Sequence, residues 1–461
     1  MKEQILSTLH ELRLYALEKG YVVSILFREE DSNLMRFANS AISLNTNEHL
    51  IRIEVTSYEG KKRASYEMIT SLDQMDIMKK GVDTAAEMVK HAMPLDYNPT
   101  IPLLDEDFSD ESGYDAALAT MTNSEKLEFL NQVSKGLETP DIKLGGIFSS
   151  GTNVLAEVST LSDKSLYIKF TDTQVNAVLS HEQLKWEVIA EQSAQQKSDL
   201  DPTPLNEDLS FLLDHYEHDQ PQQVTLGTYD IVFGAAAIAD MLHFFHYIGF
   251  DGGMMKRGYS FLTPEHIGKK VFSEQVNLYD DANDRRTFPY KRDLLGMKRN
   301  TYPLVEKGVF CGFEYVQDEA DEFSEKATGH TVYHDSLVMK GGIQKIQSLK
   351  ELVSQPRDND LLYFPFIHYM NIVNPSKGVI TGSSRFGALL LKKDGSIIVP
   401  YNYRITQSLL DIFGDKVAWV SSEVEAYNIS SSYAARNPQA IVVPKFMRVN
   451  SLEISHSNSS Y

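Results

Sequence analysis

The chain has 461 residues, of which 42% are hydrophobic and 23% are charged. This is the composition of a folded globular protein, and the length is enough for two domains. The formal net charge of −20 argues against nucleic-acid binding, which depends largely on lysine and arginine neutralising phosphates. No stretch approaches the roughly 18 apolar residues that cross a bilayer, and the single cysteine, Cys311, excludes an internal disulfide. We expect a cytoplasmic protein with no nucleic-acid and no membrane partner.

The first elements in chain order are a helix and antiparallel strands. Apolar residues recur at steps of three and four over 3–19, which predicts a helix, and Gly20 stands at its C-terminal cap. Apolar and polar residues then alternate over 23–27 and again over 51–55. This period of two is typical of strands with one buried face.

A hairpin and a second helix follow. A glycine turn is expected to lead into a strand at 62–66. An apolar stripe then predicts a helix over about 72–92, with Ser71 and Gln74 spaced as a capping box. This order of elements favours a helix-plus-antiparallel-sheet domain over 1–195, completed by a helix at 124–138 and by several further strands.

A change of composition marks the expected domain boundary. Residues 196–223 are rich in Gln, Asp, Asn and Pro, which is typical of a linker. A short helix is expected within it at Leu209–Leu213. The predicted second domain is 224–461.

The second domain is predicted to be larger and rich in strands. It opens with a strand at 227–233 and a helix at 235–248. Beyond this the pattern is mostly that of strands with glycine-marked turns, interrupted by helices near 348–354 and 405–413. The tail after Asn450 is polar and is expected to fray. The fold class is therefore α+β with two domains.

The segment with the most chemical information is the helix that carries His243 and His246. Two histidines three residues apart share one face of a helix and can both reach one metal ion. A hydrolytic zinc site also needs a third ligand and a carboxylate that takes a proton from the bound water. Phe244 stands where such a carboxylate usually follows the first histidine. Two interpretations stay open: local hydrogen bonding against packed aromatic residues, or a bound metal.

A second histidine pair, His330 and His334, flanks a segment with strand-forming residues at 331–333. Residues four apart on a strand face the same side, so this pair could complete a site with His243 and His246. Surface or loop histidines are the alternative interpretation.

Four other segments are assigned structural roles. Cys311 is expected to be a buried structural thiol, and the segment Gly382–Gly387 is expected to form a tight turn between strands. Asp280 and Asp281 could bind a cation, but we interpret them as exposed turn carboxylates. The basic residues at 291–292 and 298–299 are interpreted as solvated loops.

The chain resembles the TldD/PmbA family, which includes proteins described as modulators of DNA gyrase and as peptide-maturation metallopeptidases. Several segments carry this resemblance, and they occur in the family's order and spacing along nearly the whole chain. In the C-terminal half they are the strand 228–233 with the helix 235–248, and the segments 256–260, 276–281, 305–309 and 381–384.

The resemblance implies a two-part peptidase and identifies this chain as similar to its PmbA/TldE-type subunit. The TldD-type subunit carries His-Glu-x-x-x-His on the central helix and a cysteine ligand near the C-terminus. Here His243 matches the first histidine, Phe244 replaces the glutamate and Ile248 occupies the position of the second histidine. Residues 443–449, where the cysteine is expected, contain none. A further departure lies at 290–293, where the family usually has an acidic stretch.

We therefore expect a non-catalytic subunit of a cytoplasmic metallopeptidase complex, involved in proteolysis and peptide maturation. This chain is expected to hold no metal, with His243 and His246 as the candidate ligands if it does, and zinc is expected in the partner. The expected partner is a TldD-type subunit, or a second copy of the chain in a dimer, and the substrate is an unfolded peptide. Two alternatives remain: a divergent self-sufficient metallohydrolase that uses His243 and His246, and a pure interaction protein that modulates gyrase or a toxin–antitoxin pair.

Overall fold

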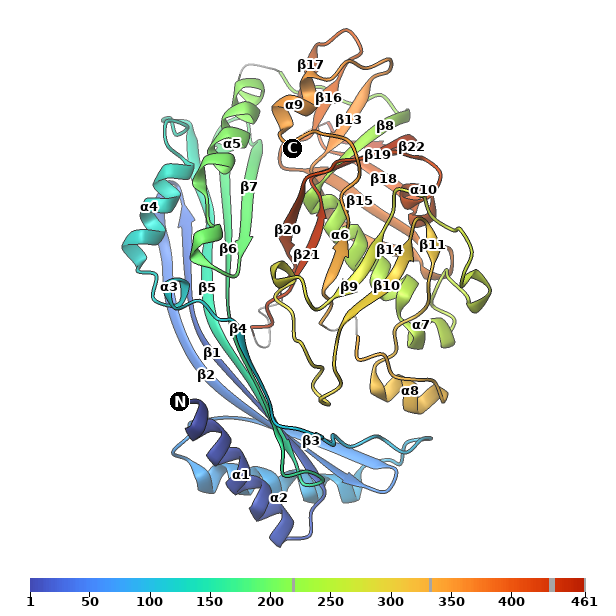
Figure 1. Cartoon of the computed structure of the whole chain (residues 1–461). Coiled ribbons are helices and arrows are strands. Elements are labelled where there is room, and N and C mark those ends of the chain that lie inside the picture. The colour runs from blue at the N-terminus through green and yellow to red at the C-terminus, as the bar shows by residue number, and fades with distance from the viewer. Residues whose placement is uncertain (218–219, 331–333, 431–435, 460–461) are drawn as a thin grey trace.

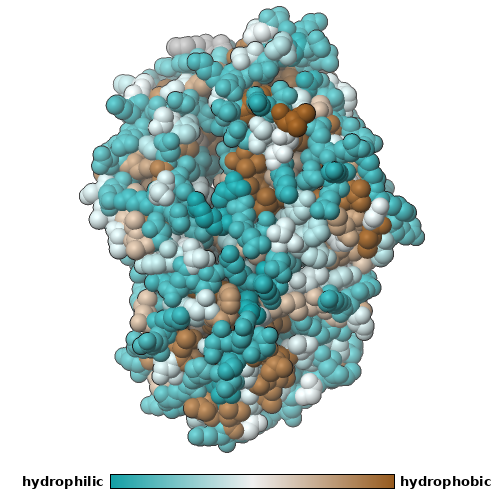
Figure 2. Space-filling model, viewed as in Figure 1, coloured by the Kyte–Doolittle hydropathy of each residue, from teal (hydrophilic) through white to brown (hydrophobic). Residues whose placement is uncertain are grey.

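The computed structural model describes residues 1–217, 220–330, 334–430 and 436–459 and has an α+β fold (Figure 1). A long curved sheet and its helices form the N-terminal part, and two further sheets form the C-terminal part. Figure 2 shows the molecule from the same side as Figure 1: hydrophilic residues cover most of this face, and apolar residues lie in scattered groups. In the described ranges, no helix combines the length and the apolar character needed to cross a membrane.

The N-terminal sheet has seven strands in the order β3-β2-β1-β5-β6-β4, with β7 paired to β6. Only β4 runs parallel to its neighbour. The alternating pattern at 23–27 and 51–55 lies in β1 and β2, as predicted. The strands are β1 Val23–Ala38, β2 Ala41–Glu59, β3 Lys62–Thr70, β4 Phe108–Gly113, β5 Ile142–Ser159, β6 Ser165–His181 and β7 Glu187–Ala194.

The two faces of this sheet have different neighbours. Odd-numbered residues of β1, such as Ile25 and Phe27, share a core with helices α1 (Lys2–Glu18) and α2 (Met75–His91). Even-numbered Leu26 belongs to a second cluster with Tyr290 of the C-terminal part. Because successive side chains of a strand point to opposite faces, this alternation turns one face of the sheet to the helices and the other to the C-terminal part.

Two predictions about the N-terminal helices need correction. The capping box at Ser71 and Gln74 is wrong: the Ser71 hydroxyl donates to Asp73, and the Gln74 amide oxygen accepts from Thr70. A capping box occurs instead at Thr122, which begins α4 (Asn123–Val133). This helix ends before the predicted residue 138. A one-turn helix, α3 (Ala116–Ala119), precedes it.

The segment 196–223 contains helix α5 (Pro202–Tyr216), which is much longer than the expected Leu209–Leu213. The Asp201 carboxylate accepts from the Thr203 amide and caps the helix. Its buried leucines join a core that also includes Val232 and Phe446 from the C-terminal part. The apolar face of this helix therefore links the two parts of the chain.

The C-terminal part contains a six-stranded sheet of order β11-β10-β9-β12-β21-β20 and a nine-stranded sheet of order β14-β15-β18-β22-β8-β13-β16-β17, in which β19 also pairs β22. The strands are β8 Gly227–Gly234, β9 Leu278–Asp281, β10 Thr301–Glu306, β11 Val309–Phe310, β12 Leu337–Met339, β13 Leu361–Phe364, β14 Phe366–Asn374, β15 Val379–Arg385, β16 Leu389–Leu391, β17 Ile397–Ile398, β18 Tyr403–Ser408, β19 Val417–Val420, β20 Val424–Asn428, β21 Ala440–Pro444 and β22 Phe446–Ser457.

Helix α6 (Ala235–Phe245) contacts strands of both C-terminal sheets and is largely buried. The other helices of this part are α7 Gly252–Lys256, α8 Gln317–Phe323, α9 Leu349–Ser354 and α10 Leu409–Phe413. Short 3-10 turns lie at Lys197–Asp199, Pro264–His266, Arg285–Thr287 and Pro375–Lys377.

Three predictions for this part are wrong. The tail does not fray, because β22 pairs with β8 and β18 and its alternating residues Leu452 and Ile454 are buried. The helix expected at 405–413 begins only after β18. The segment Gly382–Gly387 is mostly part of strand β15 rather than a turn. In each case strand pairing, which is a long-range property, overrides the local composition.

Candidate functional site

Helix α6 and the π-helical turn that follows it, His246–Phe250, position the two histidines. The Asp251 amide donates to the His246 carbonyl at 3.2 Å, a five-residue spacing that such turns have. His243 and His246 lie on one face, as predicted, and the Nδ1 atoms of both lie within hydrogen-bonding distance of Asp335 Oδ2, at 3.2 and 3.3 Å. Their shared partner is 89 or more residues away in sequence, so the expected local hydrogen bonding is wrong.

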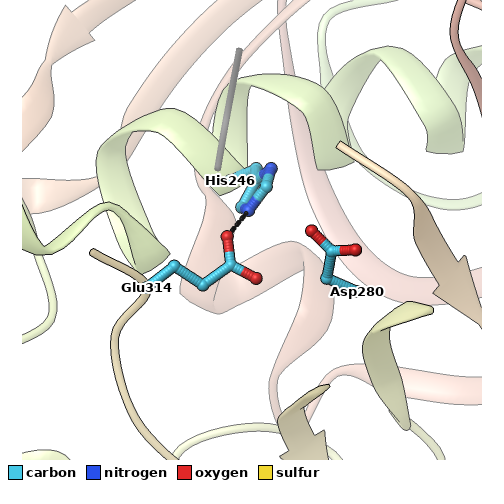
Figure 3. A group of neighbouring side chains, drawn as sticks. All are labelled: His246, Asp280 and Glu314. Atoms are coloured by element: carbon cyan, nitrogen blue, oxygen red, sulfur yellow. Dashed lines mark hydrogen bonds and ion pairs between the residues drawn. The ribbon is translucent and has the colours of Figure 1, made fainter. Parts of the chain in front are cut away.

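His246 is held between two buried carboxylates. Its Nε2 atom lies 2.5 Å from Glu314 Oε2, and the exposed fractions of the two side chains are 0% and 2% (Figure 3). Burial opposes a charge on His246, but Glu314 and Asp335 outweigh it and raise its pKa well above the ordinary value. Burial raises the pKa of Glu314, and His246 lowers it in part. Because Asp335 also faces the ring, we assign the proton to His246.

Asp280 lies beside this pair and belongs to a second ion pair. Its carboxylate accepts from Arg299 Nη2 at 2.9 and 3.2 Å, and His330 Nδ1 lies 3.1 Å away. Burial would raise the pKa of Asp280, but Arg299 and His330 lower it. The prediction of an exposed turn is wrong for Asp280, and Arg299 of the predicted basic loop is also buried. Asp280 and Arg299 are both buried because each neutralises the charge of the other.

The second histidine pair is divided between two environments. His330 reaches the site through Asp280, whereas His334 stacks on Tyr290 with ring centroids 3.4 Å apart. Burial and Arg299 lower the pKa of His334 to about 3, which keeps this ring neutral. The strand predicted at 331–333 lies outside the described residues. No contact joins His330 or His334 directly to His243 or His246 among the described hydrogen bonds.

The positions that correspond to the peptidase motif do not form a zinc site. Phe244 offers no acid–base group, and the side chain of Ile248 is fully buried in the apolar core. Residues 443–449 supply no cysteine, and Val443 packs in the same core. A zinc ion held by these positions would therefore have His243 as its only ligand, whereas zinc usually takes three or four protein ligands.

A different set of residues could approach one cation: His246, Asp280 and Glu314 each offer an atom within 4.8 Å of the others (Figure 3). Two ligands of one tetrahedral zinc lie roughly 3.3 Å apart, because each is about 2.0–2.1 Å from the metal. The 2.5 Å between His246 Nε2 and Glu314 Oε2 is instead a hydrogen bond. Asp280 is already neutralised by Arg299. The site therefore fits an internal ion network and does not fit a hydrolytic metal.

Sequence reasoning missed Glu314, Asp335 and the partnership of Asp280 with Arg299. Glu314 follows the aromatic segment 310–313 with no recognisable spacing to a histidine. Asp335 directly follows His334, which is a weak signal. Cys311, expected to be buried, is only partly so, and burial raises the pKa of its thiol.

Asp240 lies one turn before His243 on α6, and its burial predicts that the stability of the fold depends on pH. Burial raises the pKa of Asp240 to about 7, and His243 lowers it slightly. A carboxyl whose folded-state pKa is raised destabilises the fold as pH rises from the unfolded value of about 4 to the folded value. We expect Asp240→Asn to be more stable than the wild type, with an advantage that grows by about 2–3 kcal/mol between pH 5 and pH 8.

Urea unfolding at the two pH values measures this difference. The matched control is Asp105→Asn, at an exposed carboxylate, for which we expect no pH-dependent advantage. Equal stabilities of Asp240→Asn and wild type at both pH values would contradict the prediction.

The chain belongs to the PmbA/TldD family, because residues 226–456 match the family model described as the PmbA/TldA metallopeptidase C-terminal domain. Among solved structures, it is similar to TldE from Thermococcus kodakarensis, at 15% identity, with 97% of this chain and 99% of that chain covered and a TM-score of 0.78.

Two proposed modulators of DNA gyrase have the same fold. The protein from Thermotoga maritima is 14% identical, over 97% of this chain and 99% of that chain, with a TM-score of 0.73. The protein from Bacteroides thetaiotaomicron is also 14% identical, over 97% of this chain and 98% of that chain, with a TM-score of 0.75. A search of curated proteins found no match. The predicted family resemblance is confirmed.

Proposed function

We propose that this chain is a non-catalytic, PmbA/TldE-type subunit of a metallopeptidase complex in the cytoplasm. A TldD-type partner supplies the zinc, the water and the base, and this chain helps to enclose the partner's site and to admit unfolded peptide segments. The observation that carries the proposal is that both ring nitrogens of His246 already have partners within the protein. Both of its ring nitrogens face buried carboxylates, so the buried histidine at the C-terminal end of α6 is a structural cation.

The motif position next to His243 supports the same proposal. Peptide hydrolysis by a metal-bound water needs a base within hydrogen-bonding reach of that water. Phe244 cannot accept a proton, and the carboxylates nearest to His246 are already paired. Proteolysis by this chain alone would therefore need groups that α6 does not offer.

The test compares the isolated chain with a mixture of the chain and a TldD-type partner. We expect no peptide cleavage and no stoichiometric zinc in the isolated chain, and cleavage when the partner is present. His243→Ala is expected to leave the activity of the mixture within about twofold of the wild type, because this side chain is partly exposed and has no catalytic role. A partner whose motif glutamate is replaced is the control for the source of activity.

The alternative of a self-sufficient metallohydrolase predicts the opposite results. The proposal would be wrong if the isolated chain showed metal-dependent cleavage and His243→Ala abolished it. The alternative of a pure interaction protein predicts that the mixture cleaves no faster than the partner alone. Light scattering of the chain with and without the partner then separates a dimer of this chain from a mixed complex.

A further inference from the structure

A cavity of about 570 Å³ lies between the N-terminal sheet and the C-terminal part. Its floor is the face of the sheet that turns away from α1 and α2, and includes Arg28 on β1 and Arg52 on β2. Leu155, Phe170 and Tyr290 contribute an apolar wall. The volume is in the range of small-molecule sites, which are mostly apolar with a few placed polar groups.

The cavity gathers arginines in a chain with a net charge of −20. Five of the fifteen arginines line it, and three of them hydrogen-bond a carboxylate. These three ion pairs are Arg63 with Asp318, Arg299 with Asp280 and Arg436 with Asp172. Arg28 and Arg52 are the remaining two.

Arg28 and Arg52 are directly opposite each other on neighbouring antiparallel strands. Like charges at such positions destabilise a sheet. Arg52 comes no closer than 4.0 Å to Glu30 and Glu67. The side chain of Arg28 has no hydrogen bond or ion pair to any residue that the structure describes, and its buried Nε atom has no partner. Among the described residues, Arg28 therefore faces the cavity without an ion pair, and Arg52 faces it with two long ion pairs only.

Among the described residues, the carboxylates around the cavity make no hydrogen bond to Arg28 or Arg52, because each one bonds another group. Glu29 bonds His49 at 2.8 Å, and Glu30 accepts from Ser32 at 2.6 Å. Asp293 accepts from two backbone amides of its own loop. Asp318 is held by Arg63, as described above.

Glu157, on the same face of the sheet, is buried, and burial raises its pKa well above the ordinary value. Arg28 lowers this pKa in part, but burial outweighs it, so the charged form of Glu157 that could balance Arg28 is disfavoured.

We propose that this cavity binds an organic carboxylate with an apolar body, held by Arg28 and Arg52. A guanidinium binds a carboxylate through two parallel hydrogen bonds, and two guanidinium groups on one face can share one anion. The apolar body would contact Leu155, Phe170 and Tyr290. The carboxylate can belong to a free acid or to the C-terminus of a peptide. This binding does not depend on a partner subunit or on hydrolysis.

Isothermal titration of the isolated full-length chain with three probes tests the proposal. The probes are 3-phenylpropionate, the tripeptide Ala-Ala-Phe and its C-terminal amide. We expect at least one of the two carboxylates to bind. The amide is expected to bind about tenfold more weakly than the tripeptide, or not at all, because it cannot form the charged hydrogen bonds with a guanidinium group. Tighter binding of the tripeptide identifies a peptide C-terminus, and binding of 3-phenylpropionate alone identifies a free acid. Binding of the tripeptide and the amide with the same measurable affinity, or no binding of any probe at millimolar concentration, overturns the proposal.

The variant Arg28→Met assigns the binding to this cavity. It is expected to weaken carboxylate binding about tenfold or more, whereas Arg36→Met, on the same strand but outside the cavity, leaves it unchanged. Without ligand, the melting temperature of Arg28→Met is expected to equal or exceed that of the wild type, because a like-charge pair is removed. A melting temperature lowered by several degrees would show that Arg28 has a structural partner, and unchanged binding would exclude it as the anchor.

Discussion

Replacing His246 with alanine is expected to lower the free energy of unfolding by about 3–5 kcal/mol, the usual cost of removing one member of a buried ion network. His246 is the cation between Glu314 and Asp335, and all three side chains are shielded from water. Without the imidazole, two buried carboxylates would face each other with no shared proton. Water does not reach them to compensate, so the loss exceeds that of a single neutral hydrogen bond.

The matched control is His243→Ala, one helical turn away. His243 bonds the same oxygen of Asp335, but its side chain is 43% exposed, so we expect a loss of about 1 kcal/mol or less. Urea unfolding at pH 7 measures both variants. Losses of similar, small size would mean that His246 is not the cation of the network.

The dependence on pH gives a second check on His246. A histidine whose folded-state pKa is raised stabilises the fold fully below the unfolded value of about 6.5, and that contribution is lost as pH rises through the folded value. The destabilisation by His246→Ala is therefore expected to be largest at pH 6 and to shrink at alkaline pH. A destabilisation that grows with pH would contradict the assigned proton.

The parts of the fold that sequence predicted are those set by local periodicity. The period of two in β1 and β2 and the steps of three and four in α1 follow from which face each element buries. The strand and helix at 227–248 were recognisable for the same reason, and so was the common face of His243 and His246. Secondary structure in these segments depends on neighbours only a few residues away.

The partners of the site could not be predicted in this way. Glu314 is 68 residues from His246, and Asp335 is 89 residues from it. Which acid meets which base is decided by how these distant segments pack against one another, and no spacing in the chain encodes that. The polar tail after Asn450 shows the same limit, because its strand exists only through pairing with β8 and β18. The composition of a segment does not show which distant strands it pairs with.

Asp280 and Asp281 allow an experimental comparison of two environments that the sequence does not distinguish. The two residues are adjacent and identical, but only Asp280 is fully buried. Asp280 is fully buried and neutralises Arg299, which is itself buried. We expect Asp280→Ala to cost about 3–5 kcal/mol, because it leaves the guanidinium buried and uncompensated. Asp281 is partly exposed and accepts from the Thr301 hydroxyl and the Asn283 amide. Asp281→Ala is expected to cost only about 1–2 kcal/mol, because water can replace the carboxylate at this partly exposed position.

A double variant separates the lost charge from the lost packing. If an unpaired Arg299 causes the large effect of Asp280→Ala, then removing both charges with Asp280→Leu and Arg299→Met should cost less than Asp280→Ala alone, since a buried ion pair can often be replaced by apolar residues of similar size. His330, which also faces Asp280, would lose its carboxylate in both variants, so its contribution cancels in the comparison. Urea unfolding of the wild type and these variants at pH 7 gives the result. A double variant that is less stable than Asp280→Ala would show that the pair itself, rather than the penalty of an unpaired charge, stabilises this end of β9.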